Sequence, residues 1–130
     1  VFLLILMRNI HSLKNTSQFR EVYEQGRSYA NSLLVVYILA QDGETGNGHI
    51  PEQRLGISVS KKVGNSVVRH RITRIIRESF RSLRPGLPQD CSIVVVARPR
   101  AKDRSFSDIC DAMRYLCKKL NSYTSPEKMI

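Results

Sequence analysis

The stretch that decides the fold of this chain is Lys61-Lys62-Val63-Gly64-Asn65-Ser66-Val67-Val68-Arg69-His70-Arg71-Ile72-Thr73-Arg74-Ile75-Ile76-Arg77-Glu78-Ser79-Phe80-Arg81. It predicts a turn followed by a long helix with two different sides. On a helical wheel, one arc is apolar and holds Val68, Ile72, Ile75, Ile76, Phe80 and Leu83. The opposite arc is cationic and holds His70, Arg71, Arg74, Arg77, Arg81 and Arg84, with Glu78 as its one acid. Because unmixed positive charge repels itself, we infer that this arc binds a polyanion.

The composition agrees with a polyanionic partner. The chain has 130 residues, a length typical of one domain, and carries 21 Lys and Arg against 11 Asp and Glu, for a net charge of +10. A basic domain with clustered charge indicates nucleic acid as the partner. The alternative is a basic protein that is merely kept soluble by its charge, and clustering argues against it.

Cysteine, histidine and hydropathy patterns exclude several classes. Three cysteines without C-x-x-C spacing indicate a reducing compartment rather than a disulfide framework. The three histidines are too scattered for a zinc site, and the apolar run over residues 1–7 is too short to span a bilayer. We therefore expect a cytoplasmic protein with no membrane association. Residues 1–12 are expected to be a disordered extension, or in part a wrongly assigned start, because Met7 directly precedes basic sequence.

The remaining pattern predicts an α+β domain. A helix capped by Asn15 or Thr16 ends at Gly26. Strands are expected over residues 33–40 and 54–60, joined by a loose connection over 41–53 between paired strands, and over 92–97, where a continuous apolar run indicates burial on both faces. A capping box at 105–108 starts a last amphipathic helix, with apolar positions Phe106, Ile109, Cys110, Met113, Leu116, Cys117 and Leu120.

These elements predict a small two-layer sandwich in the order α-β-β-(β)-α-β-α, with a βαβ-like unit in the middle. Residues 13–123 are expected to form one RNA-binding domain, followed by a polar tail over 124–130. In the strand over 54–60, alternation sends Leu55, Ile57 and Val59 to one face. Its other face is small and polar, with Gly56, Ser58 and Ser60, and offers a surface on which a ligand can lie.

No catalytic constellation stands out. The acids form no D-x-D or E-x-K arrangement that would hold a divalent metal, and the sequence has no phosphate-binding loop or dinucleotide fingerprint. The sequence therefore predicts no catalytic side chains, no protein-bound metal and no organic cofactor. A nuclease that acts alone stays as a lesser alternative.

Phosphate binding is the better-supported chemistry. Lys61, Lys62 and Asn65 precede a helix N-terminus, where free N–H groups and the helix dipole favour anions. The arginines Arg71, Arg74, Arg77 and Arg81 continue the line with planar forks that match phosphate oxygens. A line of about six to eight phosphate contacts implies a log–log salt slope on the order of −4 to −7.

An aromatic group accompanies the small polar strand face. Phe19 and Tyr23 share one side of the first helix, and Tyr37 lies on the strand over 33–40. Beside Ser58, these rings can form a platform on which unpaired bases stack. Packing in the core is the alternative for each ring, and the pattern leaves both open.

The chain resembles the protein subunit of bacterial ribonuclease P over nearly its whole length, from Leu13 to about Tyr123. The resemblance rests on Phe19-Arg20-Glu21-Val22-Tyr23 followed by Gly26, on residues 56–67 (Gly-Ile-Ser-Val-Ser-Lys-Lys-Val-Gly-Asn-Ser-Val), on residues 68–78, and on the apolar strand that ends at Ala97-Arg98. The order and spacing of these segments are highly specific.

The resemblance implies an α+β fold with a left-handed βαβ crossover, of the type found in the second domain of a small-subunit ribosomal protein and contrary to the usual right-handed rule. It implies a role in removing the 5′ leader of precursor tRNA, in which the RNA subunit performs Mg²⁺-dependent hydrolysis and the protein positions the substrate. The implied partners are ribonuclease P RNA and precursor tRNA, with no obligate protein partner and with Mg²⁺ bound mainly by RNA.

The resemblance also implies which residues take part. The family's Arg-Asn-Arg signature at the catalytic RNA corresponds to Arg69-His70-Arg71, continued by Arg74 and Arg77. The cleft for the single-stranded leader corresponds to Phe19, Tyr23, Val35, Tyr37 and Ser58. His70 replaces the usual Asn and Thr73 stands where Lys is common, so contacts at these two positions are expected to differ. A structural RNA-binding protein, such as a ribosomal component of similar fold, is the main alternative.

Overall fold

The structure, a computed structural model, describes residues 10–40 and 51–124. The expectations for the chain start, the connection over 41–50 and most of the polar tail lie outside these residues. The elements in chain order are β1 (His11–Ser12), α2 (Thr16–Gln25), β2 (Arg27–Ala30), β3 (Leu34–Ala40), β4 (Gln53–Ser58), α3 (Ser66–Leu83), the 3₁₀ helix η1 (Arg84–Gly86), β5 (Cys91–Ala97), the 3₁₀ helix η2 (Pro99–Ala101) and α4 (Phe106–Thr124).

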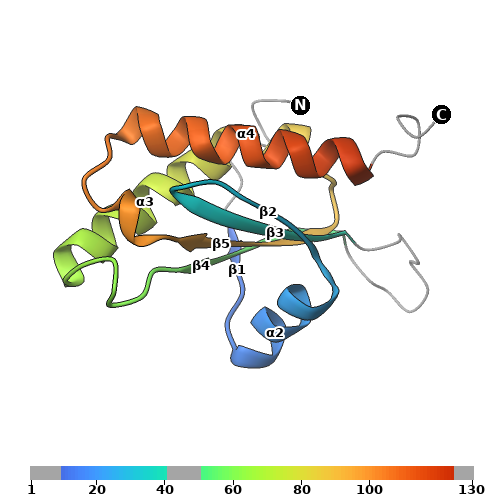
Figure 1. Ribbon diagram of the computed structural model, residues 1–130. Coiled ribbons are helices and arrows are strands. Elements are labelled where there is room, and N and C mark those ends of the chain that lie inside the picture. The colour runs from blue at the N-terminus through green and yellow to red at the C-terminus, as the bar shows by residue number, and fades with distance from the viewer. Residues whose placement is uncertain (1–9, 41–50, 125–130) are drawn as a thin grey trace.

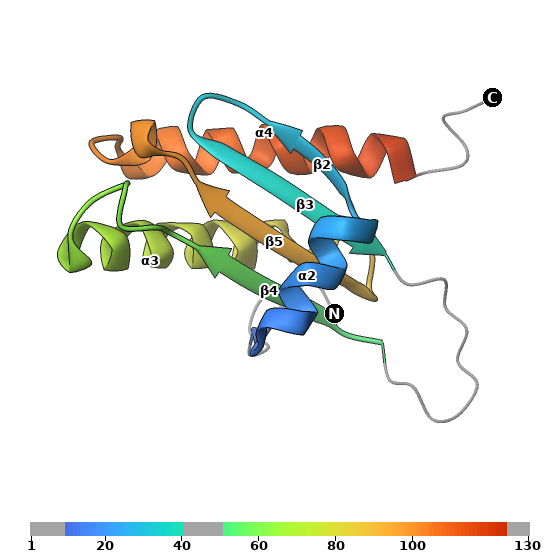
Figure 2. The ribbon, with the colours of Figure 1, turned by 60° about the horizontal axis from the view of Figure 1, so that its bottom comes forward.

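A five-stranded sheet in the order β1-β4-β5-β3-β2 forms the centre of the molecule. Helices α3 and α4 lie side by side on one face of the sheet, and α2 lies on the other (Figure 1). The α+β class predicted from the sequence is confirmed. Helix α2 covers only part of its face (Figure 2), and no other described helix lies on that side of the sheet.

Strands β4 and β5 are parallel neighbours joined by α3. Figure 2 shows both strands running in the same direction, with α3 returning behind the sheet and β5 above β4. This arrangement is the left-handed crossover that the resemblance implied. Strand β5 also pairs antiparallel with β3. Strands β3 and β4 are therefore not paired with each other, and the expectation that residues 41–53 connect paired strands is wrong.

The sequence pattern does not predict the positions of two short strands. Strand β1 pairs in parallel with β4, with His11 opposite Arg54, although the pattern assigns residues 1–12 to an extension. Strand β2 pairs antiparallel with β3 directly after the first helix. At two and four residues, both are too short to show the alternation by which strands are recognised.

Capping side chains fix where α2 and α3 begin. The Asn15 side chain accepts a hydrogen bond from the Gln18 N–H, and the Gln18 side chain reciprocates in a capping box. The Asn65 Oδ1 accepts from the Val68 N–H at 3.0 Å, so α3 starts where the sequence predicts. Gly26 ends α2 with its N–H on the Val22 carbonyl. An added Cβ there would lie 2.6 Å from that oxygen, so only glycine fits.

The main core lies between the sheet and the pair α3 and α4. Strand β5 is buried along nearly its whole length, as its apolar run predicts. Helix α3 buries Ile72, Ile75, Ile76 and Phe80, which belong to the predicted apolar arc. A smaller cluster of Leu13, Val22 and Val94 lies under α2 on the opposite face.

Arg84 departs from the helical-wheel prediction. It was expected on the cationic arc, yet only 4% of it is exposed. Its Nε donates to the Gln53 Oε1 at 3.2 Å, the Gln53 Nε2 donates to the Arg84 carbonyl at 2.9 Å, and its guanidinium lies 5.9 Å from the Phe80 ring centre. The helix ends at Leu83, so the wheel no longer applies at this position. Arg84 therefore fastens the end of α3 to β4.

Candidate functional site

The outer face of α3 carries the predicted cationic surface. Exposed side chains on it include His70, Arg71, Arg74 and Arg77, and Arg81 is partly exposed. Within the described part of the chain, neither Arg74 nor Arg77 has an acidic partner within 4.0 Å. The Glu78 carboxylate lies 3.8 Å from the Arg81 guanidinium, and this exposed ion pair contributes little. The face is therefore available to an external anion.

Two arginines of this face are less free than the others: Arg71 is held by a hydrogen bond, and Arg69 is partly buried. The Arg71 Nη2 donates to the Arg104 carbonyl at 2.7 Å, which ties α3 to the segment that precedes α4. Arg69 is only partly exposed, and its Nε is buried without a partner among the described residues. Thr73 donates its hydroxyl to the Arg69 carbonyl at 2.9 Å. Arg69 and Thr73 lie at the border of the cationic face, whereas His70 is well exposed.

The turn before α3 completes the cationic surface. Lys61 and Lys62 are exposed in a turn that the Val63 N–H closes on the Ser60 carbonyl at 3.1 Å. The Asn65 side chain caps the helix and is thereby engaged. The two lysines can thus approach a phosphate at the positive end of the helix dipole, while Asn65 orients the backbone there.

The aromatic residues meet on the opposite face, between α2 and the sheet. The ring centres of Phe19 and Tyr23 are 6.3 Å apart, and those of Tyr23 and Tyr37 are 4.9 Å apart in an edge-on arrangement. A Cβ on Gly56 would lie 2.7 Å from two atoms of the Phe19 ring. The ring therefore rests directly on the β4 backbone, and the small polar strand face has the position that its alternation predicts.

Tyr23 is the exposed member of the aromatic group, with 40% of its surface in contact with solvent. Partial burial raises the pKa of its hydroxyl, the neighbouring Tyr37 adds to the rise, and a hydrogen bond with Ser58 opposes it. The phenol therefore stays neutral at physiological pH and can donate a hydrogen bond. Phe19 and Tyr37 are partly buried, so they serve as both core and surface.

Sheet register places the other predicted cleft residues in one row. Val35 lies opposite Val96, and Val96 lies opposite Ser58. Residues paired across neighbouring strands share a face. All three are partly exposed, whereas Val94, in the neighbouring row, is fully buried under α2. The row and the three aromatic rings thus form one partly exposed surface next to α2, which we call the aromatic groove (Phe19, Tyr23, Val35, Tyr37, Ser58 and Val96).

Acidic side chains near the sheet edge are neutralised within the protein. Arg54 donates to the Ser92 hydroxyl at 2.9 Å, to the Glu52 carboxylate at 3.2 Å and to the Asp90 carboxylate at 3.4 Å. Over residues 10–40 and 51–124, no group of three or more His, Cys, Asp or Glu side chains is arranged to hold a metal ion. None of the described helices is long and apolar enough to cross a membrane.

One exposed residue was missed by the sequence analysis. Phe106 was assigned to the apolar face of the last helix, yet 53% of it is exposed. It lines a pocket next to Arg71 and Arg74. Its position matches the apolar period of α4. Because Phe106 is the first residue of that helix, however, it lies beyond the edge of the core and stays exposed.

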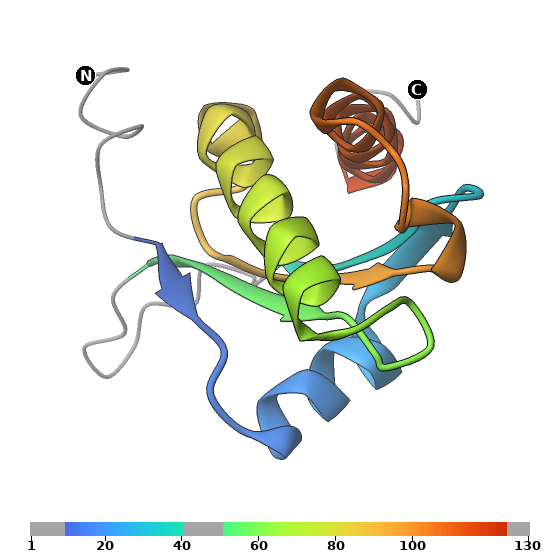
Figure 3. The same cartoon turned by 90° about the vertical axis from the view of Figure 1, so that its left-hand side faces the viewer.

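The two surfaces lie on opposite sides of the sheet (Figure 3), with the cationic face on α3 and the aromatic groove beside α2. Fold and surfaces together define a small, basic α+β protein. One face is suited to bind the phosphate backbone of a nucleic acid, and the other is suited to stack with unpaired bases.

Comparisons with known proteins agree with this class. A family model described as Ribonuclease P matches residues 7–121. The ribonuclease P protein component of Lachnoclostridium phytofermentans is 45% identical over 119 residues, covering 90% of this chain and 97% of the relative. That of Clostridium novyi is 39% identical over 117 residues, covering 90% and 99%. This chain therefore belongs to the ribonuclease P protein family, whose members are tRNA-processing subunits of a ribonuclease that also contains an RNA.

Solved structures agree in fold. The RNase P protein of Staphylococcus aureus superposes with a TM-score of 0.73 at 35% identity, covering 85% of this chain and 95% of that one. The RNase P protein from Thermotoga maritima superposes with a TM-score of 0.70 at 25% identity, covering 86% and 97%. The family resemblance inferred from the sequence is confirmed.

Proposed function

We propose that this chain is the non-catalytic protein subunit of a ribozyme endonuclease that removes the 5′ leader of precursor tRNA. Its cationic face, from Lys61 to Arg81, binds the catalytic RNA subunit. Its aromatic groove binds the single-stranded leader, so that substrate and catalyst are held on opposite sides of one rigid sheet. The RNA subunit performs the hydrolysis, and the work takes place in the cytoplasm with no further protein required.

The observation that carries this proposal is the separation of two unlike surfaces. On α3, the forks of Arg74 and Arg77 lack acidic partners within the described residues, and planar guanidinium groups match phosphate oxygens. In the groove, Tyr23 combines an exposed ring with a neutral hydroxyl, and Tyr37 stands edge-on to it at 4.9 Å. Such rings stack on unpaired bases and contribute about 1–3 kcal/mol per base.

Mg²⁺ fits the RNA better than it fits this protein. Glu52 and Asp90 already share the Arg54 guanidinium, and no three described His, Cys, Asp or Glu side chains are grouped so as to hold a metal ion. We therefore propose that the metal ions are held by the RNA subunit and the substrate. The protein's positive charge lowers the Mg²⁺ concentration that the RNA requires, because it supplies part of the counter-charge.

Reconstitution tests the proposal directly. The purified chain is added to bacterial ribonuclease P RNA at low Mg²⁺, and cleavage of precursor tRNA is measured. We expect stimulation by the chain and no cleavage without the RNA. Absence of stimulation would overturn the proposal in favour of another RNA-binding role. Cleavage by the chain alone would assign the reaction to protein side chains.

Variants of each surface separate the two RNA contacts. The double variant Arg74→Ala/Arg77→Ala is expected to weaken binding of the catalytic RNA and to flatten the log–log salt slope by about 2, since each lost phosphate contact removes about one unit. The control Arg114→Ala/Lys119→Ala removes the same charge from exposed positions on α4. An equal flattening in both double variants would mean that only net charge matters.

The aromatic groove requires a comparison of two RNAs. Phe19→Ala or Tyr37→Ala is expected to weaken binding of precursor tRNA by about 1–2 kcal/mol more than binding of mature tRNA, because only the precursor carries a leader to stack. Tyr115→Ala, which removes an exposed ring from α4, is the matched control. Equal losses for both RNAs would assign Phe19 and Tyr37 to the core alone.

A further inference from the structure

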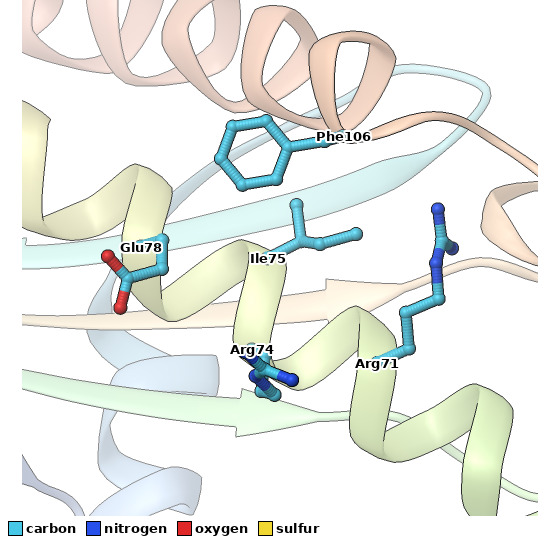
Figure 4. Close-up of a pocket in the computed structure, with 5 residues that line it drawn as sticks. All are labelled: Arg71, Arg74, Ile75, Glu78 and Phe106. Atoms are coloured by element: carbon cyan, nitrogen blue, oxygen red, sulfur yellow. The ribbon is translucent and has the colours of Figure 1, made fainter.

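The pocket around Phe106 is a second aromatic site, separate from the aromatic groove. Phe106 is the first residue of α4, and its pocket has a volume of about 240 Å³ and is lined by Arg71, Arg74, Ile75 and Glu78 of α3. Figure 4 shows the Phe106 ring beside Ile75, with Arg71 on one side and Glu78 on the other. The floor is thus apolar, and the rim carries two cations and one acid.

The geometry of this pocket is fixed before any ligand arrives. The bond from the Arg71 Nη2 to the Arg104 carbonyl, at 2.7 Å, ties its two walls together although they lie 33 residues apart. The Ser105 hydroxyl accepts the Asp108 N–H at 3.1 Å and so sets the first turn of α4. Ile75 is buried beneath the ring. The pocket is therefore preformed, so binding of a ligand costs little conformational entropy for ordering the protein.

The chemistry of the rim identifies the ligand class. A single exposed aromatic ring is ordinary on a protein surface, but this ring shares a pocket with Arg71 and Arg74 of the face that the proposed function assigns to RNA. A planar ring over an apolar floor, with two arginines among the lining residues, matches a base and its neighbouring phosphates. An apolar peptide would leave Arg71 and Arg74 without anionic partners, whereas an RNA strand supplies them.

Glu78 gives the pocket a preference among bases. A carboxylate accepts hydrogen bonds only, and it repels phosphate, so its place in a cationic face disfavours the backbone. Guanine presents two adjacent donors, its ring N–H and its amino group, on one edge, and a carboxylate can accept both. Adenine and uracil present no such pair. Among the described residues, the one ion pair of Glu78 is the exposed 3.8 Å contact with Arg81, so the carboxylate is accessible.

We propose that the Phe106 pocket binds an unpaired nucleobase of RNA, with guanine favoured by Glu78. This inference rests on the proposed function, because it needs an RNA on the cationic face. The base can come from the catalytic RNA or from precursor tRNA, and the two sources share the same chemistry.

Tryptophan fluorescence tests stacking without relying on activity. The chain contains no tryptophan, so Phe106→Trp introduces a single reporter into the pocket. We expect its emission to be quenched on binding of RNA. Tyr115→Trp is the matched control, because Tyr115 lies on the same helix, is 54% exposed and has the Lys119 ammonium over its ring at 5.7 Å. Equal quenching in both variants would overturn the proposal.

Affinity provides a second readout. Phe106→Ala is expected to weaken RNA binding about fivefold to a hundredfold, the range that corresponds to loss of one stacked base. Phe106→Leu keeps an apolar side chain at this position and is expected to lose nearly as much, because it lacks the ring. Tyr115→Ala is expected to bind as the unsubstituted chain does. If Phe106→Ala also binds unchanged, the pocket holds no base.

Glu78→Gln separates base recognition from simple repulsion by the sign of its effect. If Glu78 only repels RNA, removing its charge strengthens binding. If it accepts from guanine, the same change weakens binding. In the Phe106→Trp background, short uridine oligonucleotides that carry one guanine are expected to quench more than those that carry one adenine, and Glu78→Gln is expected to abolish the difference. Equal quenching by both oligonucleotides would overturn the preference for guanine.

Separate titrations identify the source of the base and separate two kinds of failure. The Phe106→Trp chain is titrated with ribonuclease P RNA alone and with precursor tRNA alone, and the RNA that quenches supplies the base. If the unsubstituted chain binds neither RNA with a steep salt dependence, the proposed function fails. If it binds with that dependence and Phe106 variants behave as their Tyr115 controls do, the pocket inference fails alone.

Discussion

Replacing Gly56 with alanine tests the contact that forms the floor of the aromatic groove. A Cβ at this position would lie 2.7 Å from the Phe19 Cε1 and Cζ atoms and 3.0 Å from the Leu13 Cδ1 atom. Real contacts of a Cβ are longer, so the Phe19 ring must move outward. Overpacking of this kind costs about 1–3 kcal/mol. Alanine also lowers the conformational entropy of the unfolded chain, which stabilises the folded state by about 0.4–1 kcal/mol. The free energy of unfolding is therefore expected to fall by a net amount of roughly 0.5–2 kcal/mol.

Urea unfolding of matched variants measures this loss. Gly86→Ala is the control, because nothing lies within 4 Å of its added Cβ, and it is expected to be neutral or slightly stabilising. Phe19→Leu removes the ring, so Gly56→Ala in that background is expected to cost nothing. The coupling free energy between positions 19 and 56 is then roughly 0.5–2 kcal/mol. The reasoning is refuted if Gly56→Ala is as stable as Gly86→Ala or if the two positions do not couple.

Three further predictions concern buried groups. Arg84→Met is expected to lower the free energy of unfolding by about 1–3 kcal/mol, because it leaves a buried hydrogen-bond acceptor without its donor, whereas Arg81→Ala changes it by less than about 0.5 kcal/mol; urea unfolding measures both. Burial raises the pKa of the Cys91 and Cys117 thiols from 9.0 to about 12. A thiol reagent at pH 8 is therefore expected to modify the half-buried Cys110 first, as mass spectrometry of digested protein would show. Because both thiol pKa values are raised by folding, their contribution to stability is present below about pH 9 and is lost as the pH rises toward 12.

Local signals made most of the helices predictable. Asn15, Gly26 and Asn65 mark helix ends by chemistry that acts within a few residues, and the structure uses each of them. The apolar residues of α3 likewise recur with the period of a helix, which can be recognised from the sequence without knowledge of tertiary contacts. The two faces of β4 were visible for the same reason, since alternation is a local property of a strand.

Features that depend on distant segments were not predictable. Nothing in residues 41–53 reveals that β5 inserts between β3 and β4, because the pairing partner lies some forty residues further on. Arg84 and Phe106 lie at helix ends. There, burial depends on how the chain enters or leaves the helix, and a helical wheel does not describe this. The clustering of Phe19, Tyr23 and Tyr37 was anticipated as one of two alternatives, and only the packing distances place the rings together.

The central position of β5 also governs when the protein can fold during its synthesis. Strand β5 joins β4 on one side to β3 on the other, yet it ends only at Ala97. Three-quarters of the chain must therefore be made before the sheet can close, and the pairings that close it are non-local, which slows folding. Until then, the emerging chain presents the arginine-rich segment of α3 without the core that anchors it. The RNA that the folded protein is proposed to bind can therefore contact this basic segment before the sheet has formed.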